Sequence, residues 1–207
     1  MKEIIKLLNQ MRGITQTGLA YTKDPYDEER YIELEAITKK LIAQLTTLKH
    51  EEINMIFSAE EGYATPKTDI RAVVFNDQNQ LLLVKEKSDN CWALPGGWAD
   101  IGLTPGEVAV KEVKEEAGVT VEPMKILAIM DKYKHNFAPE FSYIYKIFIQ
   151  CEVLSGEIST GLETEDVAFF NFQQIEDLSL SSRRNTLEQI KLMFEYQLNP
   201  NKEAYFD

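Results

Sequence analysis

The sequence predicts a mixed α/β fold, in which strands and helices of the α+β kind surround a mixed sheet, preceded by a small helical domain. Three observations support this prediction. Apolar residues recur at helical spacing in the first part of the chain, strand-like apolar runs follow from about residue 67, and helical spacing returns near the end. Because strands alternate with helices there, we expect a layered domain over residues 67–207, a linker over 59–66 and a helical domain over 1–58.

The helical domain is predicted to contain three helices. Apolar residues at helical spacing between residues 4 and 11 predict a first helix that stops near Gly13. A second pattern extends to residue 48 and follows the segment DPYDEER, in which Asp24 can cap a helix and proline suits its first position. The segment HEEINMIFS, residues 50–58, predicts a third helix. We expect this bundle to pack on the main domain or to form a dimer, with contacts from Tyr21, Tyr26 and Tyr31.

The main domain is predicted to contain five strands and a final helix. The stretch DIRAVVFNDQNQLLLVKEK, residues 69–87, has two apolar runs joined by polar residues and predicts a hairpin. The runs ILAIMDKYK, FSYIYKIFIQCEV and VAFFNF predict strands at residues 126–134, 141–153 and 167–172. Helical spacing then predicts a helix over residues 182–198.

A further helix is predicted in the stretch LPGGWADIGLTPGEVAVKEVKEEAGV, residues 94–119. Thr104 and Glu107 form a capping-box pattern with Pro105 between them, so a helix should begin at Pro105. Gly118 stands where a helix commonly ends in a left-handed residue. The helix is therefore expected over residues 105–117.

This helix carries three glutamates on one face. At about 100° per residue, Glu112, Glu115 and Glu116 fall within about 100° of each other. Like charges at this spacing repel, so a bound cation would stabilise the helix. Oxygen ligands without histidine or cysteine suit magnesium or manganese. The stretch LPGGW before the helix offers two glycines, where the backbone can approach an anion or ligate a metal through a carbonyl.

The composition restricts the class of partner. The formal net charge of −12 disfavours non-specific binding to nucleic acid or to anionic membranes, because both are negatively charged. The two cysteines, Cys91 and Cys151, have no paired spacing, and no stretch is apolar enough to predict a membrane span or a signal peptide. We therefore expect a cytoplasmic protein without a disulfide, acting on a small phosphorylated molecule.

The stretch from Gly97 resembles the signature of the Nudix hydrolases. That signature has a glycine, five residues, a glutamate, seven residues and then Arg-Glu-apolar-any-Glu-Glu-any-Gly-apolar, and residues 111–119 match its second half as KEVKEEAGV. Two positions depart from it: Leu103 replaces the first glutamate, and Lys111 replaces the arginine. The metal-binding glutamates of the signature are all present, so we expect an active variant.

The resemblance covers nearly the whole chain. The segments GYATPKTDIRAVVF, LLLVKEK and WALPGGWADIG, with the helical leader, are similar to the Nudix branch that includes CDP-choline pyrophosphatase and members assigned to ADP-ribose. The resemblance implies a Nudix-type α/β/α sandwich, a homodimer and a Mg²⁺ cofactor, for which Mn²⁺ can substitute. It also implies hydrolysis of a nucleoside diphosphate linked to another group.

The resemblance and the residue chemistry together assign the site residues. The metal ligands are expected to be Gly97, Glu112, Glu115 and Glu116. A carboxylate must accept the proton of the attacking water, and Glu112 or Glu116 competes for this role with Glu163 and Glu165, of which Glu163 is favoured. Substrate contacts are expected from Arg71, Lys85, Trp98 and Lys111, and Lys132, Lys134 and His135 are candidates for the mouth of the site.

Several reactions remain open at this point. CDP-choline, cleaved to CMP and phosphocholine, is the leading substrate, and ADP-ribose, cleaved to AMP and ribose 5-phosphate, is the alternative. A 3′ exonuclease acting on RNA would use similar metal chemistry, although the net charge disfavours it. A non-catalytic nucleotide sensor is the remaining class, and it predicts weakened metal ligands that this sequence does not have.

Overall fold

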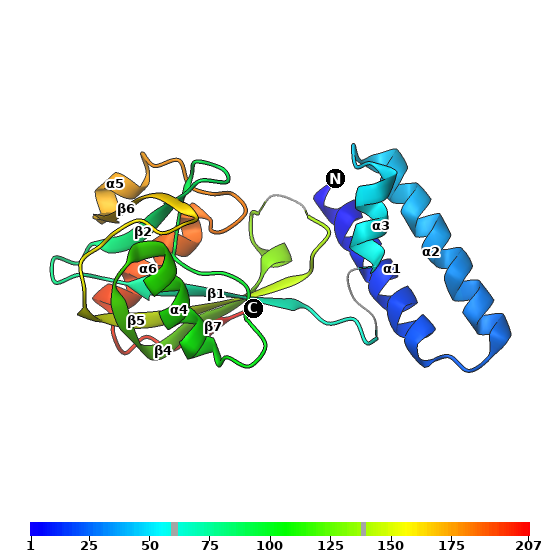
Figure 1. Cartoon of the computed structure of the whole chain (residues 1–207), viewed down its shortest axis with the longest axis horizontal. Helices are drawn as coiled ribbons and strands as arrows, with labels where there is room; N and C mark the ends of the chain where they lie inside the picture. Colours follow the sequence, from blue (N-terminus) through cyan, green and yellow to red (C-terminus); the bar gives the residue numbers. More distant parts are fainter. Residues whose placement is uncertain (59–61, 138–139) are drawn as a thin grey trace. The chain divides into compact units, whose positions relative to one another are not determined.

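The structure, a computed structural model, describes residues 1–58, 62–137 and 140–207 (Figure 1). The chain divides into two compact units. The first comprises residues 1–66 with a later stretch that ends at Tyr143, and the second comprises the rest of the chain from Lys67 onward. Each unit has its own cluster of buried apolar side chains. The predicted linker, residues 59–66, lies partly outside the described residues.

Where the structure describes it, the first unit has three helices, α1 (Lys2–Tyr21), α2 (Pro25–Leu45) and α3 (His50–Ser58). Its core contains Leu8, Ile42 and Ile53, one from each helix. The second helix begins where the sequence predicts, because the Asp24 carboxylate accepts the amide hydrogens of Tyr26 and Asp27 at 2.8 and 3.2 Å. None of the helices in the described residues is both long enough and apolar enough to cross a membrane.

The first helix is longer than predicted, because it continues through Gly13 to Tyr21. A glycine inside a helix costs only about 1 kcal/mol relative to alanine, and Thr15 beyond it is buried. Gly18 has a packing role, since a Cβ atom there would lie 2.4 Å from the Tyr31 ring. The missing side chain therefore lets α1 and α2 approach closely, and the prediction of a stop at Gly13 is wrong.

In the described residues, the second unit contains two sheets. Their strand orders are β1–β5–β4–β7 and β3–β2–β6. The bounds are β1 Lys67–Val74, β2 Leu81–Glu86, β3 Trp92–Ala93, β4 Thr120–Asp131, β5 Ile144–Ser155, β6 Thr164–Phe170 and β7 Tyr205–Phe206. Because β1 pairs with β5 in parallel and β4 pairs with β5 antiparallel, the larger sheet is mixed. The predicted mixed α/β class is confirmed.

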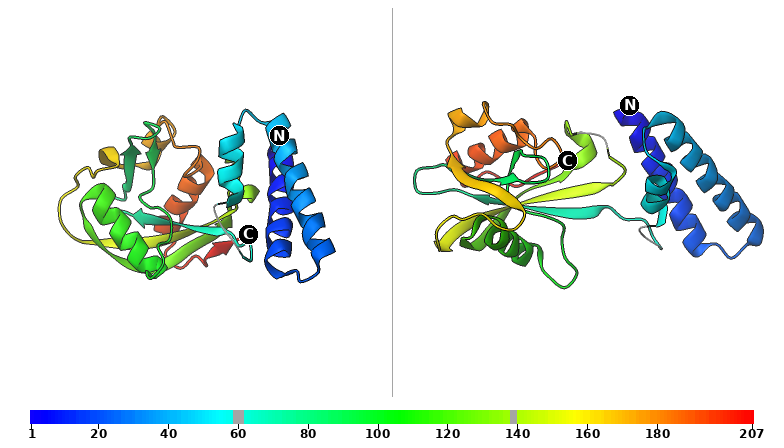
Figure 2. Two further views of the ribbon diagram at one scale, coloured as in Figure 1. Left: turned by 45° about the vertical axis from the view of Figure 1, so that its right-hand side comes forward. Right: turned by 45° about the horizontal axis from the view of Figure 1, so that its top comes forward.

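Helices cover both sides of the strands (Figure 2). On one side α4 (Pro105–Ala117) packs on apolar side chains that include Ile70 and Val84. On the other side α6 (Leu187–Leu198) packs on side chains that include Val73 and Leu83. The short helices α5 (Phe172–Ile175) and η1 (Lys132–Lys134) complete the unit. Successive residues of β1 and β2 thus face opposite helices, as expected for strands buried on both faces.

The predicted hairpin forms only at its closed end. Asn76 and Gln80 hydrogen-bond across the turn, and Phe75 bridges Leu81. Beyond that point the two strands separate, because β1 pairs with β5 whereas β2 pairs with β3 and β6. The hairpin prediction is therefore wrong for most of its length. The separation places the ends of β1 and β2 on two different sheets.

The predicted limits of the glutamate helix are confirmed. Thr104 and Glu107 form a capping box, Pro105 is the first helical residue and Gly118 has a left-handed φ of 78°. The last long helix starts later than predicted, at Leu187, because Thr186 caps it in a capping box with Gln189. The residues before Thr186 instead run beside β3, where Leu180 pairs in parallel with Trp92.

Candidate active site

Three carboxylates from distant parts of the chain meet beside the glycine loop. Glu86 lies at the end of β2, Glu116 in the last turn of α4 and Glu163 directly before β6. One carboxylate oxygen of each lies within 4.8 Å of the other two. Glu86 and Glu116 are buried and Glu163 is exposed. Three negative charges so close together repel unless a cation or protons neutralise them.

Glu86 is oriented by the alternation of side chains along β2. Leu82 and Val84 face the α4 side of the sheet, and Glu86 continues the same face two residues later. Its carboxylate forms an ion pair of 2.9 Å with Nε of Arg184. Burial raises the pKa of Glu86, and the positive charges of Arg184 and Arg71 oppose that shift.

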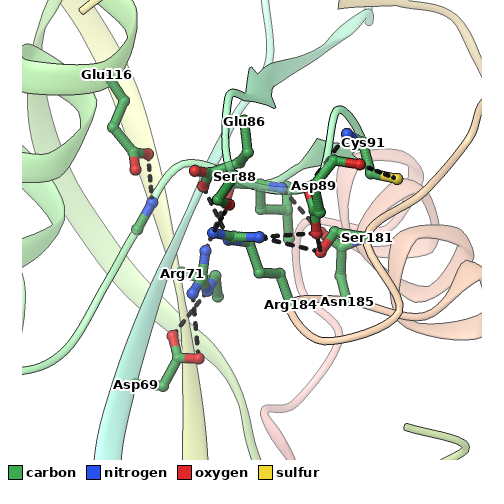
Figure 3. Close-up of polar contacts among 12 residues, drawn as sticks. Asp69, Arg71, Glu86, Ser88, Asp89, Cys91, Glu116, Ser181, Arg184 and Asn185 are labelled. Carbon is green, nitrogen blue, oxygen red and sulfur yellow. Dashed lines mark hydrogen bonds and ion pairs between the residues drawn. The ribbon is translucent and has the colours of Figure 1, made fainter. Parts of the chain in front are cut away.

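Glu116 is held by the glycine loop. The backbone amide of Gly96 donates a hydrogen bond of 2.9 Å to its carboxylate (Figure 3). Gly96 has a φ of 144°, and a Cβ atom there would lie 2.0 Å from the carbonyl oxygen of Ile70, so only glycine fits. Burial raises the pKa of Glu116 to about 8, although the Gly96 amide lowers it. A cation at this position would favour the ionised carboxylate.

Glu163 is held by a loop that lies against the end of α4. The amide of Lys87 donates to the Glu163 carbonyl at 2.9 Å. The Thr164 hydroxyl donates to the Glu116 carbonyl at 2.8 Å. A Cβ atom at Gly161 would lie 1.8 Å from the carbonyl oxygen of Glu115, so the loop approaches the helix more closely than any other residue type permits. These contacts bring Glu163 to Glu116 from 47 positions away in the sequence.

The other two glutamates of α4 differ in position from Glu116. The Glu112 side chain is 14 % exposed, and it lies against Gly97, where a Cβ atom would be 3.1 Å from its carboxylate carbon. The Glu115 side chain is 59 % exposed and lies 3.7 Å from Nζ of Lys111. Glu115 and Glu116 are about 100° apart around the helix axis, so their side chains cannot both point at the sheet. Glu115 is thus not one of the three clustered carboxylates.

The Gly97 carbonyl faces β1. It accepts the amide hydrogen of Ile70 at 2.8 Å, and the neighbouring bonds from Ala72 to Pro95 and from Ala99 to Thr68 continue the same antiparallel pattern. This carbonyl already has a hydrogen-bond donor, so metal ligation would use its second lone pair. Its role as a ligand stays a prediction.

Arg71 is buried inside the unit. Its Nε and Nη2 atoms donate to Asp69 at 2.7 and 3.1 Å, and its Nη1 atom donates to the Leu94 carbonyl at 3.1 Å. Lys146 also contacts Asp69. Three of its five N–H groups are thus engaged inside the protein, and the predicted phosphate contact of Arg71 stays a prediction. Arg71 fixes the residue directly before the glycine loop.

The remaining predicted substrate residues lie at the surface. Lys85 points to the opposite face of β2 from Glu86, and its Nζ atom lies 3.6 Å from the Glu165 carboxylate. Lys111 donates to Asp100 at 2.8 Å and lies 3.9 Å from Glu112, so it links the loop to the helix. Trp98 is 51 % exposed, which excludes a role as a core aromatic.

The candidates for the mouth of the site have separate environments. Lys132 is buried, with its Nζ atom 5.2 Å from the centre of the Phe137 ring. His135 lies 3.1 Å from the Asp207 carboxylate. Neither of these contacts involves Glu86, Glu116 or Glu163. Lys134 ends η1, and its mouth role stays a prediction.

Sequence reasoning missed Glu86 and Arg184. Glu86 lies within the quoted run LLLVKEK, and its alternation with Leu82 and Val84 was visible. The sequence does not show which face of β2 lies against α4, so this alternation alone could not identify Glu86 as a site residue. Arg184 had no local signal, because its ion-pair partners Glu86 and Asp89 lie nearly a hundred positions earlier.

The residues fit a hard divalent cation. The donors are three carboxylates without histidine or cysteine, which suit magnesium or manganese rather than zinc. Burial raises the pKa of Glu116 to about 8, so a proton on this carboxylate is the alternative to a cation. A cation of charge +2 would neutralise most of the charge of the three carboxylates.

Residues 65–191 match the family model described as the NUDIX domain. The chain belongs to the Nudix family. Residues 2–57 match a second model, described as the UDP-X-like, N-terminal oligomerisation domain. Both parts of the predicted family resemblance are therefore confirmed, and the protein is a Nudix hydrolase.

Relatives of this Nudix hydrolase are named for diphosphate cleavage. The Bacillus subtilis (strain 168) protein named "Putative ADP-ribose pyrophosphatase YjhB" is 43 % identical over 96 % of this chain and 94 % of its own length. The crystal structure of an ADP-ribose pyrophosphatase from Streptococcus suis 89-1591 is 41 % identical, with a TM-score of 0.60, over 69 % of this chain and all of its own. The crystal structure of a UDP-X diphosphatase is 33 % identical, with a TM-score of 0.63, and covers both chains completely.

Proposed function

We propose that this Nudix hydrolase cleaves the diphosphate of a nucleoside diphosphate linked to a second group, with Mg²⁺ as its cofactor and Mn²⁺ as a possible substitute. The observation that carries the proposal is the cluster of Glu86, Glu116 and Glu163 beside the glycine loop. The products would be a nucleoside monophosphate and the phosphorylated second group.

The side chains divide the chemistry between them. Glu86 and Glu116, both buried, would hold the cation, and Glu163 would complete the site. When bound, the cation supplies charge neutralisation for the diphosphate and lowers the pKa of an attacking water. Glu163 is the exposed member of the cluster, so we assign it to accept the proton of that water. The Gly96 amide keeps the Glu116 carboxylate turned towards the loop.

Three nucleotides are candidate substrates. ADP-ribose comes first, because it stands in the names of two of the relatives described above. A UDP-linked substrate comes second, since it stands in the name of a solved structure that covers the whole chain. CDP-choline, which led at the level of sequence, appears in none of these three names and stays a prediction from the resemblance.

The test is product identification by chromatography. The purified full chain is incubated with Mg²⁺ and, separately, with ADP-ribose, a UDP-sugar, CDP-choline and a short RNA. Release of AMP, UMP or CMP with the matching phosphorylated partner would support the proposal and identify the base. Release of mononucleotides from RNA alone would favour the exonuclease. Saturable nucleotide binding without turnover over hours would favour a sensor.

The variant Glu116→Gln tests whether the cluster carries the reaction. We expect its turnover to fall by about 10²-fold or more, because it removes a charged ligand without changing the shape of the side chain. The matched control is Glu122→Gln, which makes the same change at an exposed position on β4. Full turnover of Glu116→Gln would show that the site is assigned wrongly.

The variant Glu163→Gln separates proton transfer from metal binding. Because Glu163 is the proposed base, replacing it should lower kcat by about 10²- to 10⁴-fold. Affinity for Mn²⁺ should fall less than in Glu116→Gln. An unchanged kcat would exclude Glu163 as the base and leave Glu112, Glu116 and Glu165 as candidates for that role.

A further inference from the structure

A short segment between α5 and α6 lies beside the candidate active site and contributes no carboxylate to it. Residues 179–185 run beside β3, where the Trp92 amide donates to the Ser179 carbonyl at 2.8 Å and the Ser181 amide donates to the Trp92 carbonyl at 2.9 Å. These bonds fix the segment against the connection from β2 to the glycine loop. Its last two residues, Arg184 and Asn185, then contact that connection through their side chains.

Arg184 binds the end of β2 and the turn that follows it (Figure 3). Its Nε atom lies 2.9 Å from the Glu86 carboxylate, and its Nη1 atom lies 3.0 Å from the Asp89 carboxylate. Its Nη2 atom donates to the Ser88 hydroxyl at 3.0 Å. The planar guanidinium therefore has three separate acceptors on residues 86–89, which restricts both its position and its orientation.

Asn185 holds the other end of the same connection. Its side-chain oxygen accepts the Leu94 amide hydrogen at 2.9 Å, while Arg71 donates to the Leu94 carbonyl at 3.1 Å. Leu94 directly precedes the PGG turn whose Gly96 amide binds Glu116. Adjacent residues of one segment thus set the positions of two parts of the site, Glu86 and the glycine loop.

The contact with Arg184 leaves Glu86 able to serve the cluster. The ion pair uses Oε1 of Glu86, and a carboxylate has two oxygens, so one can be held by a guanidinium while the other faces a cation. Without Arg184, the buried Glu86 carboxylate would have the negative charges of Glu116 and Glu163 beside it, and no guanidinium would fix its rotamer.

We propose that Arg184 is a positioning residue, which holds the Glu86 carboxylate towards Glu116 and Glu163 and thereby raises the affinity of the site for a divalent cation. The proposal rests on the proposed function, because it takes the three glutamates as the metal site. It assigns to the segment before α6 a part in metal binding, although that segment contacts the cation only through Glu86.

The experiment measures Mn²⁺ binding to the metal-free full chain, from the electron paramagnetic resonance signal of free Mn²⁺. Replacing a residue that orients a metal ligand typically weakens binding about 10- to 100-fold, and we expect this loss for Arg184→Ala. The matched control is Arg183→Ala, which removes the same charge from the exposed neighbour and should bind Mn²⁺ like the wild type. Unchanged or tighter binding by Arg184→Ala would overturn the proposal, since Arg184 would then be neutral or a competitor of the cation.

A double-mutant cycle tests whether Arg184 acts through Glu86. Once Glu86→Gln has removed the carboxylate, adding Arg184→Ala should weaken Mn²⁺ binding by less than threefold, roughly the scatter of non-interacting pairs. Equal losses from Arg184→Ala in both backgrounds would contradict the inference. If Arg184→Ala fails to fold by circular dichroism, Arg184→Lys replaces it. That variant keeps the positive charge but loses the planar guanidinium with its several donors. We therefore expect an affinity for Mn²⁺ between those of the wild type and Glu86→Gln. An affinity equal to that of the wild type would count against a positioning role.

Failure of this inference is distinguishable from failure of the proposed function. If Glu116→Gln and Glu86→Gln both bind Mn²⁺ like the wild type, the metal site itself is wrong. If both lose affinity while Arg184→Ala does not, the metal site stands and only the role of Arg184 is lost.

Discussion

At Gly161 the absence of a Cβ atom lets the loop that carries Glu163 lie against the end of α4. A methyl group there would lie 1.8 Å from the Glu115 carbonyl oxygen, which belongs to the helix backbone and cannot rotate away. Arg71, Gly96 and Arg184 act in the same way, because each fixes a part of the site without supplying one of its carboxylates. At the scale of residues, the candidate site thus consists of these supporting residues as well as of the three glutamates.

Gly161→Ala is therefore expected to lower turnover while leaving the fold in place. The loop must move away from α4, and Glu163 moves with it, so kcat should fall by about tenfold or more, as for a displaced catalytic group. Steady-state kinetics with the best substrate of the panel checks this, beside circular dichroism. Gly13→Ala is the control, because its Cβ atom would meet Ala64 at an ordinary 3.7 Å.

The two cysteines should react very differently with a thiol reagent. Cys91 is partly exposed, whereas Cys151 is buried, and burial raises the pKa of the Cys151 thiol from 9.0 to about 12. One thiol per chain should react in the native protein near pH 8 and two in denaturant, and Cys91→Ser should show none in the native state. Fast native labelling of Cys91→Ser would contradict the burial of Cys151.

Cys151 also gives a pH dependence of stability with a definite sign. Its pKa is higher in the folded state, so the unfolded chain releases the proton first as pH rises from 9 towards 12. The free energy of unfolding should therefore fall over this window, and Cys151→Ala should show a smaller fall. Urea titrations of both proteins at several pH values measure the difference.

At the scale of elements, helices were predictable where their ends carry local signals. Asp24, Thr104 and Gly118 cap helices as expected, because a cap involves only residues a few positions apart. Strand partners were not predictable in the same way. The turn after β1 looks like that of a hairpin, but β1 pairs with β5, and no residue within either run encodes that choice.

Two of the three clustered carboxylates, Glu116 and Glu163, were among the residues expected from the sequence. Glu112 and Glu115, which the resemblance to the Nudix signature assigned together with Glu116, lie outside that cluster. Glu86 joins the cluster only because β2 leaves β1 and turns the face of Leu82 and Val84 towards α4. That face is a property of the assembled sheet, so spacing alone could not reveal it.

The glycines of α1 provide a test of helix packing in the first unit. Gly13→Ala should raise the unfolding temperature, since alanine favours a helix by about 1 kcal/mol and its Cβ atom has room. Gly18→Ala should lack this gain, because its Cβ atom would lie 2.4 Å from the Tyr31 ring and displace it. Thermal unfolding of the two variants decides the point, and equal stabilisation by both would count against the close contact of α1 with α2.

At the scale of the whole molecule, the first unit points to an oligomer. Its family model carries oligomerisation in its description, and large apolar side chains such as Ile14 and Tyr21 are exposed on α1. We expect a homodimer in solution. Light scattering after size exclusion should give a mass of about twice 23.8 kDa, stable on dilution. A mass of one chain at micromolar concentration would contradict this.

The contacts that assemble the site also have a consequence for the order of folding events. Lys146 pairs with Asp69 across 77 positions, and Arg184 reaches Asp89 across 95. Such long-range pairings form late and make folding slow, on the order of milliseconds to seconds for sheet-rich domains. A nascent chain that has not reached residue 163 lacks both Glu163 and Arg184, so the proposed metal site is incomplete until most of the second unit has been synthesised. A chain that ended before Glu163 would keep the glutamate helix but lack the full carboxylate cluster, and we expect it to bind Mn²⁺ more weakly than the full chain.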